Sequence, residues 1–254
     1  MTDQLKSSGP GQSIWTRPGR AARGPVPEHT RAEIASAGVT LADARGIGAV
    51  TMRSAAAAIG TAPASLYRYV ASREELLQLM ADQVYGEFSY REPNSGDPLA
   101  DLLVLAREGR AIYRRHPWLL DIRATGNLPG PNALAFIEHA LAALAGANLT
   151  GPAKLETIGL FSGVVRLIAQ TEIGQQRAGQ DITQWQESLA GYLLKIAAAG
   201  QHPHLAAALA DQPAGTGPAQ DAPMFDRAMT RILTGMLPHA AVSPGPGRMD
   251  ATRH

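Results

Sequence analysis

The strongest constraint on the fold of this chain is a short stretch, residues 51–70, that ends one helix and at once begins another. Thr51 is a favourable N-cap for a helix over 52–59, a segment of mostly small residues with the sequence MRSAAAAI. Gly60 ends that helix. Pro63 suits the first position of a second helix over 63–69, because the N–H that proline lacks would be unbonded there anyway. Two short helices joined by a glycine-containing turn predict a helix-turn-helix unit.

The rest of the chain also carries helical patterns. Strand-like alternation of β-branched residues is absent, and alanine and leucine dominate. A helix over 28–45 precedes the unit, and Ser72 with Glu75 predicts a capping box for a fourth helix that runs to about residue 88. Apolar periodicity then predicts helices at 98–115, 117–124, 131–147, 153–178 and 182–199, one short helix within 202–211 and another within 222–237. We therefore expect an all-α fold.

Composition divides the chain into four parts. Residues 1–27 are rich in Gly, Pro, Ser and Arg without apolar periodicity, which predicts a disordered basic arm. Residues 28–88 hold the helix-turn-helix domain with its connecting helix, and the loop SYREPNSGDP marks the boundary. A second helical domain is expected over 89–240, and a disordered tail over 241–254.

Charge is distributed unevenly between the front and the body of the chain. Residues 1–70 carry eight Lys/Arg and four Asp/Glu, whereas residues 71–254 carry 15 and 18. A basic front on an acidic body favours a polyanionic partner for the front, although windows of this length also fluctuate by chance. Within the arm, Arg17, Arg20 and Arg23 either follow a minor groove of DNA or belong to a solvated linker.

In a helix-turn-helix the second helix enters the major groove of DNA, and small residues at its start allow close approach to the bases. Leu66 and Val70 would hold the helix against the core, while the hydroxyl and guanidinium groups of the YRY triplet reach phosphates. Tyr69 has packing as an alternative role. The residues predicted to contact DNA are Thr51, Arg53, Thr61, Ala62, Ala64, Ser65, Tyr67, Arg68, Tyr69 and Arg73.

The sequence ADARGIGAVTMRSAAAAIGTAPASLYRYVASREELL resembles the DNA-binding domain of the tetracycline-repressor family. The resemblance rests on the TMR entry, the small-residue helix, the P-x-x-L-Y-R core and the SREELL start of the fourth helix, and it covers about residues 28–80. Two departures are Ala62, where many members have serine, and Tyr69-Val70, which replaces a frequent His-Phe pair. The segment RHPWLLDI and the helix after it resemble, more weakly, the C-terminal domain of the tetracycline-repressor branch.

The second resemblance implies an internal pocket for a small-molecule effector and a homodimer formed by two helices of each subunit. Leu105, Gly109 and Asp121 fall where tetracycline-binding members carry polar and histidine groups, so tetracycline itself is not expected. The candidate pocket residues are Trp118, Asp121, His139, Ser162 and Arg166. The candidate interface residues are Gly159, Gly163, Leu167, Phe225, Met229, Ile232 and Met236; a central core helix in a monomer is the alternative for the first three.

Several classes of function are not supported by the sequence. There are no cysteines, and the two close histidines, His202 and His204, form a poor metal signal, so neither a metal nor a cofactor is expected. No phosphate-binding glycine loop or nucleophile elbow is present, which argues against an enzyme. No apolar run is long enough to span a membrane, and the N-terminus lacks a signal-peptide pattern, so a cytoplasmic location is expected.

These observations predict a homodimeric transcriptional regulator that binds a palindromic double-stranded DNA operator and that an effector releases. Activation instead of repression stays open. So does a different class of protein, in which the helix-turn-helix no longer reads DNA and the helical body binds a small molecule and acts through a protein partner.

Overall fold

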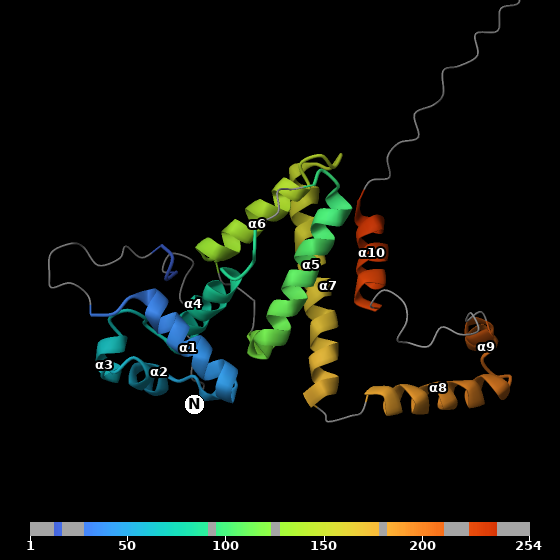
Figure 1. The fold of residues 1–254 in the computed structure, drawn as a ribbon, viewed down its shortest axis with the longest axis horizontal. Helices are drawn as coiled ribbons and strands as arrows, with labels where there is room; N and C mark the ends of the chain where they lie inside the picture. The colour runs from blue at the N-terminus through green and yellow to red at the C-terminus, as the bar shows by residue number, and fades with distance from the viewer. Residues whose placement is uncertain are drawn as a thin grey trace, which may run out of the picture.

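A computed structural model describes residues 13–16, 28–90, 95–122, 128–177, 182–210 and 224–237. Every regular element in these ranges is helical, and none is a strand. Figure 1 shows two connected parts, with α1–α4 on one side and a bundle of α5, α7 and α10 on the other. The predicted all-α fold is confirmed.

The first part contains α1 (Arg31–Arg45), the 3-10 turn η1 (Ile47–Ala49), α2 (Met52–Ala58), α3 (Pro63–Leu66) and α4 (Arg73–Tyr85). The second contains α5 (Pro98–Arg115), η2 (Pro117–Asp121), α6 (Pro131–Ala143), α7 (Gly151–Arg177), α8 (Ile182–Ala198), α9 (Pro203–Ala210) and α10 (Met224–Met236). The predicted helices exist, but several of their ends differ from the predicted bounds. The third helix ends at Leu66 rather than 69, and the segment after α5 is a 3-10 turn.

Local caps explain where the first helices begin and end. Thr30 caps α1 in a capping box with Glu33, and Thr51 caps α2 in a second box with Ser54. Gly46 and Gly60 have φ values of +76° and +72°, a region that favours glycine, and each allows the chain to turn out of a helix. These signals lie within four residues of each helix end, which is why the sequence alone locates this region well.

The helices α1 and α4 pack closely at Gly38. A Cβ atom at this position would lie 2.6 Å from the Met80 sulfur, so only glycine allows the observed approach. The surrounding core includes Ile34, Leu66 and Val70, which are fully buried. It also includes Ile112, Trp118 and Leu119 from the second part. The hydrophobic core therefore continues across the predicted domain boundary near residue 89.

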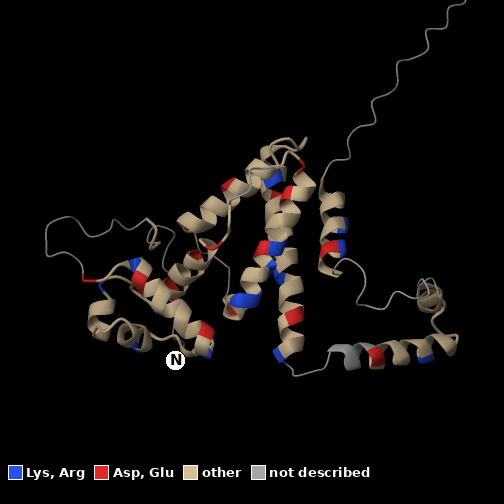
Figure 2. Cartoon of the chain, viewed as in Figure 1, with Lys and Arg blue, Asp and Glu red and all other residues tan. Residues whose placement is uncertain are grey.

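In the second part, α10 packs on α5 and α7 through Phe225, Met229 and Leu233. The helices α8 and α9 extend away from the bundle (Figure 1) and contact mainly each other. Figure 2 shows few charged residues along the described part of α8, whereas α7 carries several. A long, weakly charged surface on extended helices is suited to contact with another protein surface.

One expectation about the arm is wrong for the four residues of it that the structure describes. Residues 13–16 form a turn, and the Ile14 side chain is completely buried in the first core. Residues 1–12 and 17–27, including Arg17, Arg20 and Arg23, and the predicted tail at 241–254 lie outside the described residues.

Candidate DNA-reading head and effector site

The reading head, defined as α2, the following turn and α3, presents polar and small side chains to solvent. Leu66 and Val70 are buried beneath it, as predicted. Tyr67 is 54% exposed although it is a large aromatic residue. Of the other predicted DNA contacts, Thr51, Arg53, Ala62, Ala64 and Arg68 are exposed, and Thr61, Ser65 and Tyr69 are partly exposed.

The N-termini of α2 and α3 are capped differently. The Thr51 hydroxyl accepts a hydrogen bond from the Ser54 amide at 3.0 Å, so this side chain already serves as the cap of α2. Ala62 is the N-cap of α3 and provides no side-chain hydrogen bond. Tyr69 packs partly against the core, which supports its alternative role as a packing residue.

Arg73, also predicted to contact DNA, makes two hydrogen bonds within its own chain. Its Nε donates to the Val50 carbonyl at 2.7 Å, and Nη2 donates to the Ile47 carbonyl at 2.8 Å. Two directional hydrogen bonds fix the guanidinium beneath the segment between η1 and α2. Arg73 therefore joins α4 to the reading head, and no local sequence pattern predicts these carbonyl partners.

A cavity of about 510 Å³ lies where the two parts of the molecule meet. Its walls are formed mainly by α4, α5, α7, η2 and the segment 128–136, and most of them are apolar. Aromatic residues are frequent, and two of them, Phe88 and Phe136, have ring centroids 4.8 Å apart. The aromatic residues in the wall are Trp15, Tyr85, Phe88, Tyr113, Phe136 and Phe161.

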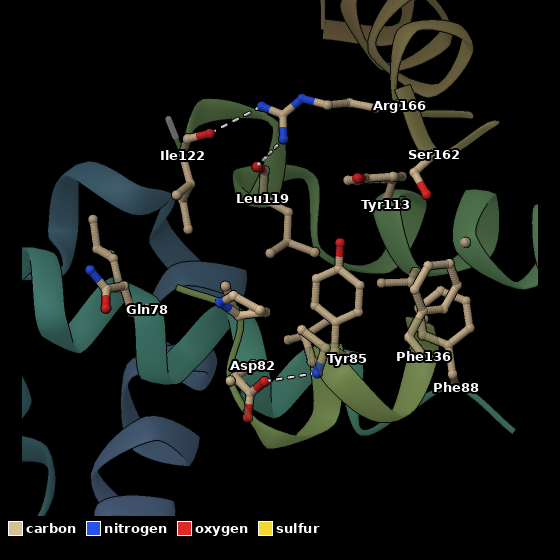
Figure 3. Close-up of a pocket in the computed structure, with 18 of the residues that line it drawn as sticks. Gln78, Asp82, Tyr85, Phe88, Tyr113, Leu119, Ile122, Phe136, Ser162 and Arg166 are labelled. Atoms are coloured by element: carbon tan, nitrogen blue, oxygen red, sulfur yellow. Dashed lines mark hydrogen bonds between the residues drawn. The ribbon is translucent and has the colours of Figure 1, made fainter. Parts of the chain in front are cut away.

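Figure 3 shows Tyr85 pointing into this cavity, with Arg166 and Ser162 approaching from α7. Burial raises the pKa of the Tyr85 hydroxyl to about 12, with a smaller contribution from Tyr113. Burial also raises the pKa of Tyr113, and the neighbouring Arg166 opposes that rise. Both phenols are therefore neutral at ordinary pH and can donate a hydrogen bond to a bound molecule.

Arg166 connects the cavity to η2. Its Nη2 donates to the carbonyls of Leu120 at 2.6 Å and Ile122 at 3.1 Å, and Nη1 reaches the Leu119 carbonyl at 3.4 Å. One guanidinium thus holds the end of η2, and it is one of two arginines, with Arg73, in a mostly apolar wall.

Asp82 connects α4 to α6 on another side of the cavity. This buried carboxylate accepts hydrogen bonds from the backbone amides of Asn132 at 3.3 Å and Ala133 at 2.9 Å. The Asn132 side chain donates back to the Asp82 carbonyl at 2.9 Å. Asp82 therefore caps α6, a position where the helix dipole favours negative charge.

Of the five predicted pocket residues, the structure brings three to the cavity and places two elsewhere. Asp121, Ser162 and Arg166 line it. Trp118 is buried outside the cavity, where its indole bonds to Asp43. His139 packs beside Tyr90, with ring centroids 4.9 Å apart, and does not line the cavity. The missed wall residues include Asp82, Tyr85 and Trp15; of these, only the isolated tryptophan in a Gly/Pro-rich arm gave a local signal.

A polar cluster links the two parts of the molecule. The Trp118 Nε1 donates to Asp43 Oδ1 at 2.6 Å, and His116 Nδ1 lies 2.7 Å from the same oxygen. The other ring nitrogen of His116 lies 3.0 Å from Glu87 Oε1. His116 is buried, whereas the side chains of Asp43 and Glu87 are about one-third exposed, so α1, the segment after α4 and η2 meet around one buried imidazole. We call Asp43, Glu87, His116 and Trp118 the junction cluster.

The predicted interface residues separate into two groups. Gly159, Gly163 and Leu167 form an exposed stripe on α7. Phe225 and Met229 are instead buried in the core of their own chain, which corrects their assignment. Two contacts accompany this packing: Arg107 pairs with Asp226 at 3.1 Å, and the Arg110 guanidinium lies 4.8 Å from the Phe225 ring centroid. Ile232 and Met236 are partly exposed.

Comparison with known proteins agrees with this arrangement. Residues 34–80 match the model of bacterial regulatory proteins of the tetR family, and residues 92–239 match the tetracyclin repressor-like C-terminal domain. The chain belongs to the tetR family. It is a DNA-binding transcriptional repressor controlled by a small-molecule effector, which confirms the predicted function and not the partner-protein alternative.

The repressor is similar to individual characterised proteins over most of its length. It is 35% identical to the HTH-type transcriptional repressor DrrR1 of Streptomyces coeruleorubidus, across 88% of this chain and 83% of that protein. The TetR family protein ActR of Streptomyces coelicolor, in complex with actinorhodin, superposes with a TM-score of 0.66 at 26% identity, covering 83% of this chain and 96% of ActR. A complex of ActR with (S)-DNPA gives a TM-score of 0.65 at 26% identity, covering 83% and 98%.

Neither a membrane span nor a metal site is found among the described residues. No helix there has both the length and the apolar character to cross a membrane. No group of three or more His, Asp or Glu side chains in the same ranges could hold a metal ion.

Proposed function

We propose that the repressor binds a near-palindromic operator as a homodimer and leaves it when a mainly aromatic small molecule fills the cavity beside Arg166. The observation that carries the proposal is the direct hydrogen-bonded route from this cavity to the DNA-binding part. Its proposed DNA contacts are the exposed residues of the reading head, without Arg73. Because the partner is bacterial DNA, the proposal also places the protein in the cytoplasm.

Direct DNA contact is supported by the reading head. Ala62 and Ala64 would let α3 approach base edges, while Tyr67 and Arg68 donate to phosphates on either side. An exposed tyrosine next to an arginine has little reason to be there for stability alone. Contacts with phosphates make such binding strongly dependent on salt.

The homodimer is supported by the outer face of α7. Leu160 and Leu167 are 52% and 62% exposed, and a Cβ atom at Gly159 or Gly163 would meet nothing within 4 Å. Leucines this exposed beside open glycines leave room for a second helix to approach closely. On α8, the side chains of Tyr192 and Leu194 are likewise exposed. A second copy of the chain would cover both surfaces.

The effector class is inferred from the cavity wall. Several aromatic side chains favour a flat ligand that stacks or packs edge-on, and the neutral phenols and Arg166 favour acceptor groups at its rim. ActR, which shares this fold, has been crystallised with actinorhodin and with (S)-DNPA. We extend only the general class, a small aromatic molecule with hydrogen-bond acceptors, to this repressor.

The route of release begins at Arg166. An acceptor group on the effector competes with the η2 carbonyls for the guanidinium. Any shift of η2 moves Trp118 and His116, which hold Asp43 on α1. Release requires the effector to bind the DNA-incompetent arrangement more tightly than the competent one. Activation would instead require the effector to bind the DNA-competent arrangement more tightly.

The test is fluorescence anisotropy with DNA from immediately upstream of the gene, at two salt concentrations. We expect selective binding by a dimer, with affinity that falls steeply as salt rises. Equal affinity for unrelated DNA of the same length would contradict the proposed operator function. The same assay then screens aromatic compounds for release.

A further inference from the structure

The segment 13–16 is anchored to helices that lie later in the sequence. The Ile14 side chain is 0% exposed and belongs to the core formed around α1 and α4. The Arg31 guanidinium on α1 donates to the Ile14 carbonyl at 2.9 Å. Within the segment, the Thr16 amide donates to the Ser13 carbonyl at 3.0 Å, which closes a turn. The segment thus has a buried apolar anchor and its own hydrogen bonds.

Trp15 lies next to Ile14 in this turn and lines the cavity. Its Nε1 donates to the Leu128 carbonyl at 3.1 Å, across 113 residues of sequence. This bond uses the only polar atom of the indole, so the ring is oriented by the segment 128–130. The apolar remainder of the ring is the part available to the cavity.

Gly130 provides the space that the indole occupies. A Cβ atom on Gly130 would lie 2.7 Å from Trp15 Cζ2 and 2.4 Å from Asp82 Cγ. The φ angle of Gly130 is −79°, which any residue can adopt, so glycine is needed here for room and not for backbone conformation. The backbone of residue 130 therefore lies directly against both the indole and the carboxylate that caps α6.

We propose that Trp15 is an effector-contacting residue and that the segment 13–16 is a built-in wall of the effector site. The inference rests on the proposed function, and it names the ligand chemistry at this wall, a planar aromatic ring that packs on the indole. Ile14 anchors the wall, Leu128 orients the ring, and Gly130 leaves room for it. A segment that composition assigns to a disordered arm thereby becomes part of ligand recognition.

The first experiment measures binding of a planar aromatic probe, 1-anilinonaphthalene-8-sulfonate, to the full-length chain by probe fluorescence. We expect Trp15→Ala to weaken binding about threefold to tenfold, the range of one lost aromatic pair. Trp15→Phe retains an aromatic face and should recover most of that loss. Gly130→Ala, which crowds the indole, should weaken binding while leaving Trp15 in the chain.

Unchanged probe affinity in Trp15→Ala would overturn the proposal, and so would failure of the wild-type chain to bind the probe at all. Operator binding is measured separately on the wild-type chain. Absence of operator binding there would contradict the proposed function, whereas the probe titrations alone decide the role of Trp15.

A second measurement tests the wall without any ligand. The chain has no cysteine, so single-cysteine variants report one position each. Ile14→Cys should react with a maleimide at least about tenfold more slowly than Thr16→Cys, because labelling of the buried site requires local opening. Thr16 is the matched control, since it lies in the same turn and is exposed. Equal rates at the two positions would show that the segment is not docked and would overturn the proposal.

Discussion

The Trp118 indole on η2 donates a 2.6 Å hydrogen bond to the Asp43 carboxylate on α1. These residues are 75 positions apart in sequence, and one belongs to each part of the molecule. The bond sits at the opposite end of η2 from the carbonyls that Arg166 holds. A 3-10 turn of five residues therefore connects the cavity directly to the first helix of the DNA-binding part.

Trp118→Phe should uncouple the two parts. The substitution keeps an aromatic ring in the core but removes the hydrogen bond to Asp43. We expect the free energy of unfolding to fall by about 1–2 kcal/mol, measured by urea denaturation. The ratio of operator affinities with and without effector should move towards one. Asp226→Asn is the control, because it weakens an ion pair outside the junction cluster; an equal loss of response in that variant would argue against the route through η2.

Arg166→Lys should loosen η2. A lysine is a single point of charge and cannot reproduce the forked hydrogen bonds that the guanidinium makes to several carbonyls. We expect faster amide hydrogen exchange at Leu119 and Ile122 and a weaker response to effector. Arg114→Lys, a change at an exposed arginine on α5, should leave both unaltered. Unchanged exchange at η2 in Arg166→Lys would show that Arg166 does not hold this turn in solution.

Tyr67→Phe and Arg68→Ala should weaken operator binding without altering the oligomeric state. Loss of a phosphate contact lowers affinity for all sequences. Only Arg68→Ala removes a charge, so only that variant should also reduce the salt slope, by roughly one per contact. Anisotropy titrations at several salt concentrations measure both effects. Arg114→Ala, an exposed arginine on α5, is the charge-matched control. If the Tyr67 or Arg68 variant became monomeric, its effect on DNA binding could not be assigned to contact.

Leu167→Arg should dissociate the dimer. The substitution places a charge in the middle of the exposed stripe of α7, where a second subunit would bury it without a partner. Sedimentation at several protein concentrations should show a monomer, with folding retained because the side chain is exposed in the single chain. Leu134→Arg, at a comparably exposed leucine on α6, should remain dimeric. A dimeric Leu167→Arg protein would move the interface away from α7.

Alkaline pH should destabilise the fold through Tyr85. Its pKa is raised from 10.0 to about 12 by burial, so the folded state retains the phenol proton more strongly than the unfolded chain. This contribution to stability is complete below pH 10 and is lost as pH rises through about 12. Tyr85→Phe should flatten this part of the curve of unfolding free energy against pH. If the unfolding free energy of the variant falls with pH as steeply as that of the wild type, groups other than Tyr85 cause the loss of stability at alkaline pH.

The sequence by itself determined the local architecture of this repressor. The end of α1 and both ends of α2 follow from Gly46, Thr51 and Gly60, because caps and turns act within a few residues of each other. The start of α1 was predicted three residues too early, at residue 28 instead of 31. The periodic apolar residues likewise located α5 at its observed bounds, 98–115. The reading head could be predicted for the same reason, since its exposed and buried faces follow helical periodicity.

Only the tertiary structure decided which side chains reach which site. Arg73 meets the carbonyls of Val50 and Ile47, Phe225 packs in its own core, and Trp15 meets Leu128 across 113 residues. Periodicity shows that a helix has an apolar face, but not which surface that face will cover. Contacts between distant segments depend on how whole helices pack, and no local pattern encodes that arrangement. The wall that Trp15 forms could therefore be identified only from the tertiary structure.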